Sequence, residues 1–365
     1  MKQYRLPFFL ELDKALAAKE IKLVVVYGTP WRGEAERGDH ADLPGPLGVK
    51  VNSTLLFGRL LWIPVLQPWW RADMVVVEHA NKNLLNYLLA LFRGLKLKKV
   101  AFWSHGCDRQ INPTSLGERF KRRTLHWADW WFSYTAESAT YVAAQGFSAD
   151  RITVVENTID TRALREDLNA VSEAEMVTMR AALAWQDDVQ VGVFCGSLYR
   201  NKRLDILFGA ADRVHQEMPR FRLLLIGGGP LSDEVARFAS DRPWVQALGP
   251  KFGHEKAVLL KLARMWLNPG LVGLGILDAF CAGLPVLTTD LPLHSPEIEY
   301  LIQDENGLMV APTVEDFADV ITRLLQDAAL MERLRKGAQS SARRYSIETM
   351  VRNFATGVDQ CLGLS

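Results

Sequence analysis

The chain has 365 residues, too many for one ordinary hydrophobic core, so its length favours two domains of roughly 100–200 residues each. Its 48% hydrophobic and 23% charged residues are typical of a soluble globular protein. No stretch approaches the roughly 18 uninterrupted apolar residues of a membrane-spanning helix. No Lys/Arg run or recognition module indicates nucleic-acid binding. The four widely spaced cysteines argue against a zinc site or a disulfide framework and for a reducing compartment. We therefore expect a cytoplasmic protein without a metal.

Basic residues and tryptophans are concentrated in the first half of the chain. Residues 1–160 contain 21 Lys and Arg against 16 Asp and Glu, and eight of the eleven Trp. Segments 55–71 and 120–131 mix apolar, aromatic and basic side chains, as the headgroup region of an anionic membrane requires. The alternative is that these Trp side chains are buried in a core or between domains. A peripheral location at the inner membrane face is therefore one of two expectations.

Apolar runs of strand length alternate with helical segments, which predicts an α/β fold with parallel sheets and crossover helices. In the first half, strands are expected at 21–28, 74–80, 99–106, 130–135 and 152–158, with a helix at about 82–95. In the second half, they are expected at 189–196, 221–228, 244–249, 265–269 and 285–290, followed by mostly helical chain from 314. The pattern predicts Rossmann-like domains at 1–160 and 189–346, a linker at 161–188 and a C-terminal helix, 347–365, that returns to the first domain.

Polar side chains follow the predicted strand 74–80 in the sequence EHANKN. Glu78, His79 and Asn81 provide a carboxylate, an imidazole and an amide within one turn, a set suited to binding the hydroxyl groups of a sugar acceptor. The alternative is a helix cap formed by Asn81 or Asn83.

Three glycine-containing turns in the second half each lie where a strand gives way to a helix. The first runs from Gly196 to Lys202 and the second from Gly227 to Pro230. The third motif runs from Pro269 to Pro285 and has its glycines at 270, 273 and 275. Such turns direct backbone N–H groups at an anion, and Lys202 adds a positive charge, although a lysine at a helix start is often only solvated. The three-glycine turn does not have the GxGxxG spacing of a dinucleotide-binding fingerprint.

Asp278 falls in the first turn of the helix expected after the third glycine turn. It either stabilises the helix dipole, an effect of about 0.3–1 kcal/mol, or accepts hydrogen bonds from ribose hydroxyl groups. The residues alone leave both readings open.

The second half resembles the donor-binding domain of the family 4 retaining glycosyltransferases, which have the GT-B fold of two facing Rossmann-like domains with a cleft between them. The family's G-[RS]-L-x-x-x-K is similar to GSLYRNK here, and its strand ending G-x-G-P is similar to IGGGP. Its A-x-G-x-P-V resembles Cys281 to Val286, and its E-N-G-x-x-V resembles Glu305 to Val310. The resemblance is clear over 189–311 and fainter over most of the chain. It implies that Lys202 contacts the donor diphosphate.

One departure from the family concerns a pair of glutamates separated by seven residues. The spacing is kept, but Gly270 stands in the first place and Asp278 in the second. Ser197 stands where the family often has an Arg that contacts a phosphate. We expect Arg200 to supply that contact instead. We expect backbone amides near Val272 to compensate for the first glutamate. The resemblance thus implies a donor site formed by Gly196, Ser197, Arg200, Lys202, Gly228, Gly270, Val272, Gly273, Leu274, Gly275 and Asp278.

In the first half, KVAFWSHGCD is similar to the family's strand followed by His-Gly. The resemblance implies that His105 and Gly106 face the cleft and that His105 acts with Lys202 and Asp278 in catalysis. The residues alone favour the alternative, that His105 is a histidine packed within the domain. Asp108 is expected to join Glu78, His79 and Asn81 as an acceptor contact. Asn157 lies in a turn similar to the family's N-x-[IV]-D before the linker.

The implied activity is retaining, metal-independent transfer of a hexose-type sugar from a UDP or GDP donor, with no further cofactor. The expected acceptor is a saccharide or a polyprenyl-linked saccharide. Two other functions remain open at this stage. Nucleotide-sugar 2-epimerases have a similar arrangement, and the missing glutamate is compatible with a catalytically silent subunit that binds sugar nucleotides.

Overall fold

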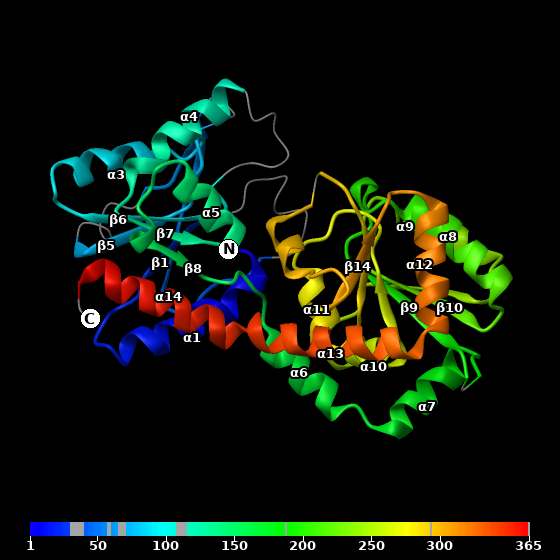
Figure 1. The fold of residues 1–365 in the computed structure, drawn as a ribbon. Helices are drawn as coiled ribbons and strands as arrows, with labels where there is room; N and C mark the ends of the chain where they lie inside the picture. Colours follow the sequence, from blue (N-terminus) through cyan, green and yellow to red (C-terminus); the bar gives the residue numbers. More distant parts are fainter. Residues whose placement is uncertain are drawn as a thin grey trace. The chain divides into compact units, whose positions relative to one another are not determined.

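The computed structural model describes residues 1–29, 40–56, 60–64, 71–106, 115–186, 188–292 and 294–363. These residues form two compact units, one made of 1–160 together with 347–365, the other of 161–346. Each unit has a parallel sheet covered by helices, as Figure 1 shows. Within the described ranges, no helix combines the length and the apolar character needed to cross a bilayer.

The first unit is built on a four-stranded parallel sheet with the order β5-β6-β7-β8. A separate parallel pair, β1 and β2, and an antiparallel hairpin, β3 and β4, complete its strands. The strand expected at 21–28 therefore pairs with β2 rather than within the main sheet. The strands are β1 (Val25–Gly28), β2 (Gly48–Val51), β3 (Thr54–Leu56), β4 (Leu60–Trp62), β5 (Met74–Val77), β6 (Lys99–Ser104), β7 (Trp130–Ser133) and β8 (Ile152–Val154). The helices are α1 (Leu6–Ala17), α3 (Leu84–Gly94), α4 (Leu116–Thr124), α5 (Ala136–Ala144) and α14 (Ile347–Leu362).

The C-terminal helix α14 is part of the core of the first unit. Phe354 stacks on Phe132 of β7 with ring centroids 4.0 Å apart, and it also meets Phe8 of α1 edge to face. Met350 and Ile347 are buried in the same cluster. The expected return of the last helix to the first domain is therefore confirmed, and Figure 1 shows α14 beside α1.

The second unit has a six-stranded, all-parallel sheet with the order β11-β10-β9-β12-β13-β14. This is the order of a Rossmann fold, in which the chain starts in the middle of the sheet, builds one half and then the other. The strands are β9 (Gln190–Cys195), β10 (Phe221–Ile226), β11 (Val245–Gly249), β12 (Met265–Leu267), β13 (Val286–Thr289) and β14 (Gly307–Val310). The helices are α6 (Thr161–Ala170), α7 (Glu173–Ala182), α8 (Leu204–Glu217), α9 (Ser232–Ser240), α10 (Gly253–Leu262), α11 (Gly275–Cys281), α12 (Val314–Gln326) and α13 (Ala328–Arg344).

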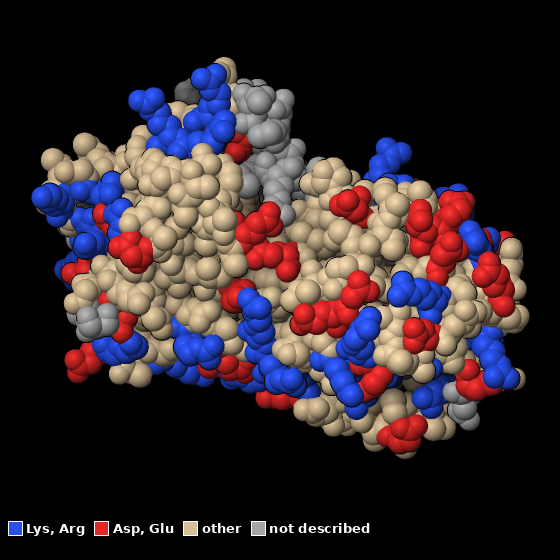
Figure 2. All heavy atoms as spheres, viewed as in Figure 1, with Lys and Arg blue, Asp and Glu red and all other residues tan. Residues whose placement is uncertain are grey.

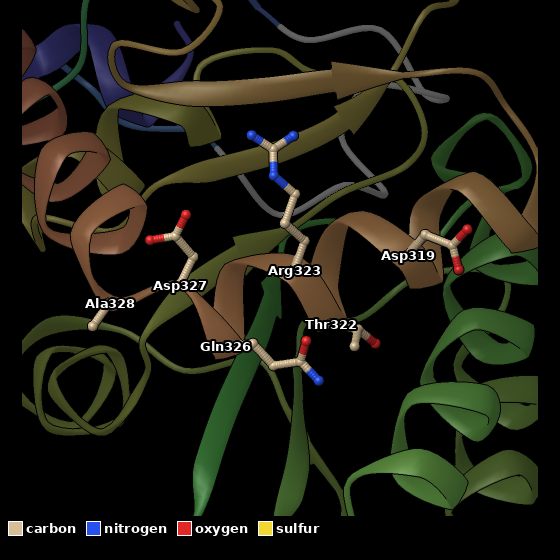
Figure 3. Close-up of a pocket in the computed structure, with 6 residues that line it drawn as sticks. All are labelled: Asp319, Thr322, Arg323, Gln326, Asp327 and Ala328. Carbon is tan, nitrogen blue, oxygen red and sulfur yellow. The ribbon is translucent and has the colours of Figure 1, made fainter.

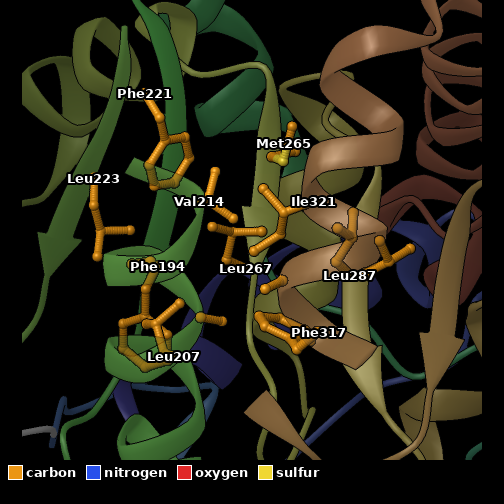
Figure 4. Close-up of a cluster of buried hydrophobic side chains, with 14 of the residues drawn as sticks. Phe194, Leu207, Val214, Phe221, Leu223, Met265, Leu267, Leu287, Phe317 and Ile321 are labelled. Carbon is orange, nitrogen blue, oxygen red and sulfur yellow. The ribbon is translucent and has the colours of Figure 1, made fainter. Parts of the chain in front are cut away.

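One face of this sheet is covered by α8 and α12. Figure 4 shows Leu207 and Val214 of α8 together with Phe317 and Ile321 of α12, packed against side chains of the strands. All four side chains are buried, and the apolar positions recur at helical spacing. Burial of this stripe fixes both helices on the sheet, and thereby the ends of the strands that carry the glycine turns.

Residues 161–188, expected as a linker, contain two helices that belong to the second unit. Helix α7 begins with a capping box in which Ser172 and Glu175 exchange hydrogen bonds with each other's backbone. His254 of α10 then contacts the Glu175 carboxylate at 2.6 Å. Both α6 and α7 pack on α10, so this stretch lacks strands, as expected, but forms part of the second unit.

Candidate functional site

The strand order of the second unit reverses between β9 and β12, and the loops that follow these two strands lie together. In open parallel sheets, ligands bind outside the carboxyl ends of the strands at such a point. The amide of Leu271, in the loop after β12, donates to the carbonyl oxygen of Asn201 at 2.7 Å. Two of the three predicted glycine turns are thereby joined at one edge of the sheet.

The second glycine turn supports the first by packing against its backbone. A Cβ atom added at Gly227 would lie 1.8 Å from the carbonyl oxygen of Gly196, and Gly227 has a φ of +150°. The Leu198 amide donates to the Gly228 carbonyl at 2.9 Å. Gly228, predicted as a donor contact, thus holds the first turn through its carbonyl group.

Lys202 lies in a short 3-10 turn before α8 and is only 9% exposed. Its Nζ donates to the carbonyl oxygen of Leu271 and lies 5.6 Å from the centre of the Tyr199 ring. Burial lowers the pKa of Lys202 to about 8. No carboxylate of the described part of the chain pairs with it, so its charge is available to an anion. Ser197 and Arg200, from the same turn, are exposed.

Gly270, in the place of the family's first glutamate, lies directly against the backbone of Lys202. A Cβ atom there would be 2.1 Å from the Lys202 carbonyl carbon and 2.3 Å from the Asn201 carbonyl oxygen. Real side chains do not approach so closely, so this position has no room for any residue but glycine. The glycine that stands in place of the glutamate thus allows a close contact between two loops.

His294, which the sequence analysis did not identify, holds the loop after β12 in place. The ring is 5% exposed; Nδ1 accepts from the Val272 amide at 3.0 Å, and Nε2 donates to the Thr289 carbonyl at 2.8 Å. These bonds define a neutral tautomer with hydrogen on Nε2. The Val272 amide, expected to face the donor, therefore already has an acceptor. Within the described residues, the amides of Gly273, Leu274 and Gly275 have none.

Replacing His294 with Phe is expected to destabilise the protein by about 1–3 kcal/mol, because the buried Val272 amide loses its acceptor while the ring volume is retained. Urea unfolding monitored by tryptophan fluorescence measures this loss. Replacement of the exposed His126 with Phe is the control, and equal stability of the two variants would contradict the role of His294.

Asp278, in the first turn of α11, forms an ion pair with Lys256 of α10. The carboxylate Oδ1 and Nζ are 3.2 Å apart, and both side chains are largely buried. Burial disfavours the Lys256 ammonium group, but the Asp278 carboxylate outweighs this and raises the pKa of Lys256. Burial and then Asp278 raise the pKa of the Cys195 thiol to about 12, so Cys195 is a neutral thiol. Lys256, which the sequence analysis missed, is thus the partner of Asp278.

The predicted acceptor residues of the first unit have different surroundings. Glu78 is exposed, whereas His79 is 3% exposed, packs on Phe102 and bonds Thr124 at 3.0 Å. Burial lowers the pKa of His79 to about 3, so the ring is neutral and belongs to the core, in contrast to the expected sugar contact. Asn81 Nδ2 donates to the Gly117 carbonyl at 2.9 Å.

Two further predictions for this turn have different outcomes. The cap expected from Asn81 or Asn83 is formed by Asn83, whose side chain accepts from the Leu85 amide at the start of α3. Asp108 lies outside the described residues.

His105 follows β6 directly, at the carboxyl edge of the first sheet, with its ring 5.9 Å from that of Tyr134. Gly106 has a φ of +80° and packs closely on Val142 and Tyr141 of α5. Asn157 follows β8 at the same edge and is buried. The structure therefore brings His105, Glu78 and Asn157 to one edge of the sheet.

A surface pocket of about 530 Å³ lies elsewhere on the second unit. Figure 3 shows its lining residues on the last turns of α12 and the start of α13: Asp319, Thr322, Arg323, Gln326, Asp327 and Ala328. None of the predicted site residues lines it. Within the described ranges, no group of three or more His, Cys, Asp and Glu side chains is arranged to hold a metal ion.

Several solved structures share this fold over nearly the whole chain. The Anabaena protein HepE, solved in complex with UDP, is 16% identical with a TM-score of 0.69, over 99% of this chain and 98% of its own. A glycosyltransferase from Rickettsia africae is 14% identical with a TM-score of 0.71, over 100% and 96%. A protein described as a putative UDP-N-acetylglucosamine 2-epimerase from Listeria monocytogenes is 15% identical with a TM-score of 0.66, over 99% and 94%.

Sequence comparisons place both units among glycosyltransferases. An exopolysaccharide phosphotransferase of Streptomyces coelicolor is 27% identical over 172 residues, 43% of this chain but only 17% of that protein. Residues 8–163 match the model for glycosyltransferase family 4, and residues 189–327 match the model for glycosyl transferases group 1. The chain therefore belongs to the family 4 and group 1 glycosyltransferases and has their GT-B fold of two Rossmann-like units.

Proposed function

We propose that this glycosyltransferase transfers a hexose-type sugar from a nucleoside diphosphate donor of the UDP or GDP type. The observation that carries the proposal is the meeting of Lys202 with the loop after β12 at the strand-order reversal of the second unit. HepE, which was solved with UDP and with UDP-glucose, supports a uridine nucleotide. In this proposal the diphosphate lies against Lys202 and the amides of Gly273 to Gly275, and Asp278 accepts hydrogen bonds from the ribose.

The proposed reaction retains configuration at the anomeric carbon. The bond between that carbon and the phosphate oxygen breaks, and negative charge develops on the departing diphosphate. Lys202 stabilises this charge, which lowers the barrier without a metal ion. The acceptor oxygen then bonds to the anomeric carbon on the same face, and its proton passes to the departing phosphate. His105 contacts the donor sugar or the leaving phosphate in this scheme.

We further propose that the acceptor is a saccharide or lipid-linked saccharide in the biosynthesis of a polysaccharide or glycoconjugate, bound by the first unit. The similarity of part of the chain to an exopolysaccharide phosphotransferase supports this class of product. The exposed carboxylate of Glu78 is the acceptor contact that the geometry supports best, because His79 is buried.

A panel of nucleotide sugars tested by thermal shift will identify the donor, since a ligand that binds the folded state raises the melting temperature. The identified donor is then incubated with candidate acceptors in the presence of EDTA, and the anomeric configuration of the product is read by NMR. We expect a product with retained configuration, and replacement of His105 with Ala is expected to lower its rate of formation. Donor binding without transfer to any saccharide would support a silent subunit.

The epimerase alternative rests on the similarity to the Listeria protein. It predicts that the donor sugar changes configuration at C2 in the absence of any acceptor. Analysis of the nucleotide sugar recovered from such an incubation separates the two activities, and an unchanged sugar excludes epimerisation. Both family models that match the chain are glycosyltransferase models, which favours transfer.

A further inference from the structure

Large apolar side chains are exposed together on two neighbouring helices of the first unit. Leu91 of α3 is 61% exposed, and Leu95 and Leu97, which follow this helix, are 60% and 58% exposed. On α4, Leu116 is 81% and Phe120 41% exposed. These five account for nearly half of the large apolar side chains exposed in the described part of the chain, and soluble proteins rarely gather them in this way.

Contacts between the two helices make this one continuous surface. Phe120 stacks on Tyr87 of α3 at a centroid distance of 6.2 Å, and Asn81, just before α3, donates to the Gly117 carbonyl of α4. Leu91 follows Tyr87 by four residues on α3, and the C-cap residue Leu95, whose amide donates to the Leu91 carbonyl, follows by four more, so the three lie on one side. Leu116 and Phe120 are likewise four residues apart on α4.

Basic residues flank the apolar ones, without exposed acidic residues between them. Helix α3 has no Asp or Glu, and the only acidic residue of α4, Glu118, is 6% exposed. Figure 2 shows Lys and Arg side chains over these helices, with uncharged residues between them. We define the α3–α4 face as the apolar residues Leu91, Leu95, Leu97, Leu116 and Phe120 with the exposed basic residues Lys96, Arg119 and Arg123.

We propose that the α3–α4 face docks the protein on an anionic lipid bilayer. Leucine and phenylalanine side chains enter the boundary between headgroups and acyl chains, while lysine and arginine side chains pair with anionic headgroups. A second copy of the same face is a poorer occupant, because it would bring two sets of positive charges together. This inference is independent of the proposed donor site, which lies in the other unit.

The residues that carry the proposal differ from those expected from the sequence. Trp130 and Trp131 of segment 120–131 are 7% and 0% exposed, because they lie in β7 at the centre of the sheet. Trp127 packs edge-on against Tyr87 and Phe120. Trp127 thus supports the two helices from within, Trp130 packs in the cluster that contains α14, and the exposed leucines of the α3–α4 face provide the apolar contact.

Vesicle flotation of the full chain tests the proposal. Vesicles of phosphatidylcholine alone are compared with vesicles containing about one third phosphatidylglycerol, at roughly 0.01 M and roughly 1 M salt. Binding is expected only to the anionic vesicles, weakening at high salt. The double variant Arg119→Gln/Arg123→Gln is expected to lower the partition coefficient about 30-fold. The variant Leu95→Gln/Leu116→Gln/Phe120→Gln is expected to lower it about tenfold or more.

Matched controls are available on the second unit. Phe252→Gln removes a side chain that is 78% exposed, and Arg333→Gln/Lys336→Gln removes two charges from the exposed side of α13. Neither variant is expected to change binding. The proposal is overturned if wild-type protein stays unbound with anionic vesicles at low salt, or if the α3–α4 variants bind as well as the controls. It is also overturned if the wild type dimerises in light-scattering chromatography and the leucine variant is monomeric.

Discussion

Replacing Lys202 with Met is expected to lower the kcat/KM of sugar transfer about 10²–10³-fold, because the substitution keeps the buried volume and removes the charge that stabilises the leaving diphosphate. Steady-state kinetics with the donor identified by thermal shift measures this effect. Lys261→Met, on the exposed side of α10, is the control and should retain the wild-type rate. If the kcat/KM of Lys202→Met were within a few-fold of the wild-type value, Lys202 would have no role in the mechanism.

The pH dependence of donor binding provides a second readout of the same group. Burial lowers the pKa of Lys202 to about 8 in the unliganded protein, so the ammonium form predominates below that pH and is lost as pH rises through it. A diphosphate pairs with the ammonium form. Donor affinity should therefore fall above pH 8 in the wild type, and isothermal titration should find this fall missing in Lys202→Met.

Replacing Gly270 with Ala is expected to destabilise the second unit by about 3 kcal/mol or more, because the new Cβ would overlap the backbone of Lys202 and Asn201. Gly270→Glu, which restores the family's residue, should be at least as destabilising and should not raise activity. Urea unfolding gives the free energies. In the control Gly273→Ala, the new Cβ meets only the Ser295 side chain, at 3.3 Å, so a much smaller loss is expected. Equal losses of unfolding free energy in Gly270→Ala and Gly273→Ala would contradict the close contact of Gly270 with the backbone of Asn201 and Lys202.

The fold was largely predictable because parallel strands buried on both faces leave a strong apolar signal. All nine strands predicted for the two main sheets are present, each one to four residues shorter than expected. The short strand β14 was not predicted, since the stretch Gly307–Val310 lies within a motif that was interpreted only as a family signature. The two helices at 161–188 also escaped prediction as part of a unit, because their packing on α10 depends on contacts distant in sequence.

The candidate site was predictable where it depends on local spacing. Lys202 lies six residues after Gly196, which places it just before the N-terminus of a helix that follows a strand. The roles of His294 and Lys256 depend instead on partners 22 residues away, Val272 and Asp278, and no local pattern relates these pairs. The burial of His79 could not be predicted either, since it depends on packing against β6 and on Thr124 of α4.

Since α14 completes the core of the first unit, the second unit is in effect an insertion within the first. Helix α14 must be synthesised before Phe354 can pack on Phe132 and Phe8. The residues of the second unit, 161 to 346, are continuous in the chain and are synthesised before this helix. The core of the sheet that carries His105 is thereby completed only after the second unit has been synthesised.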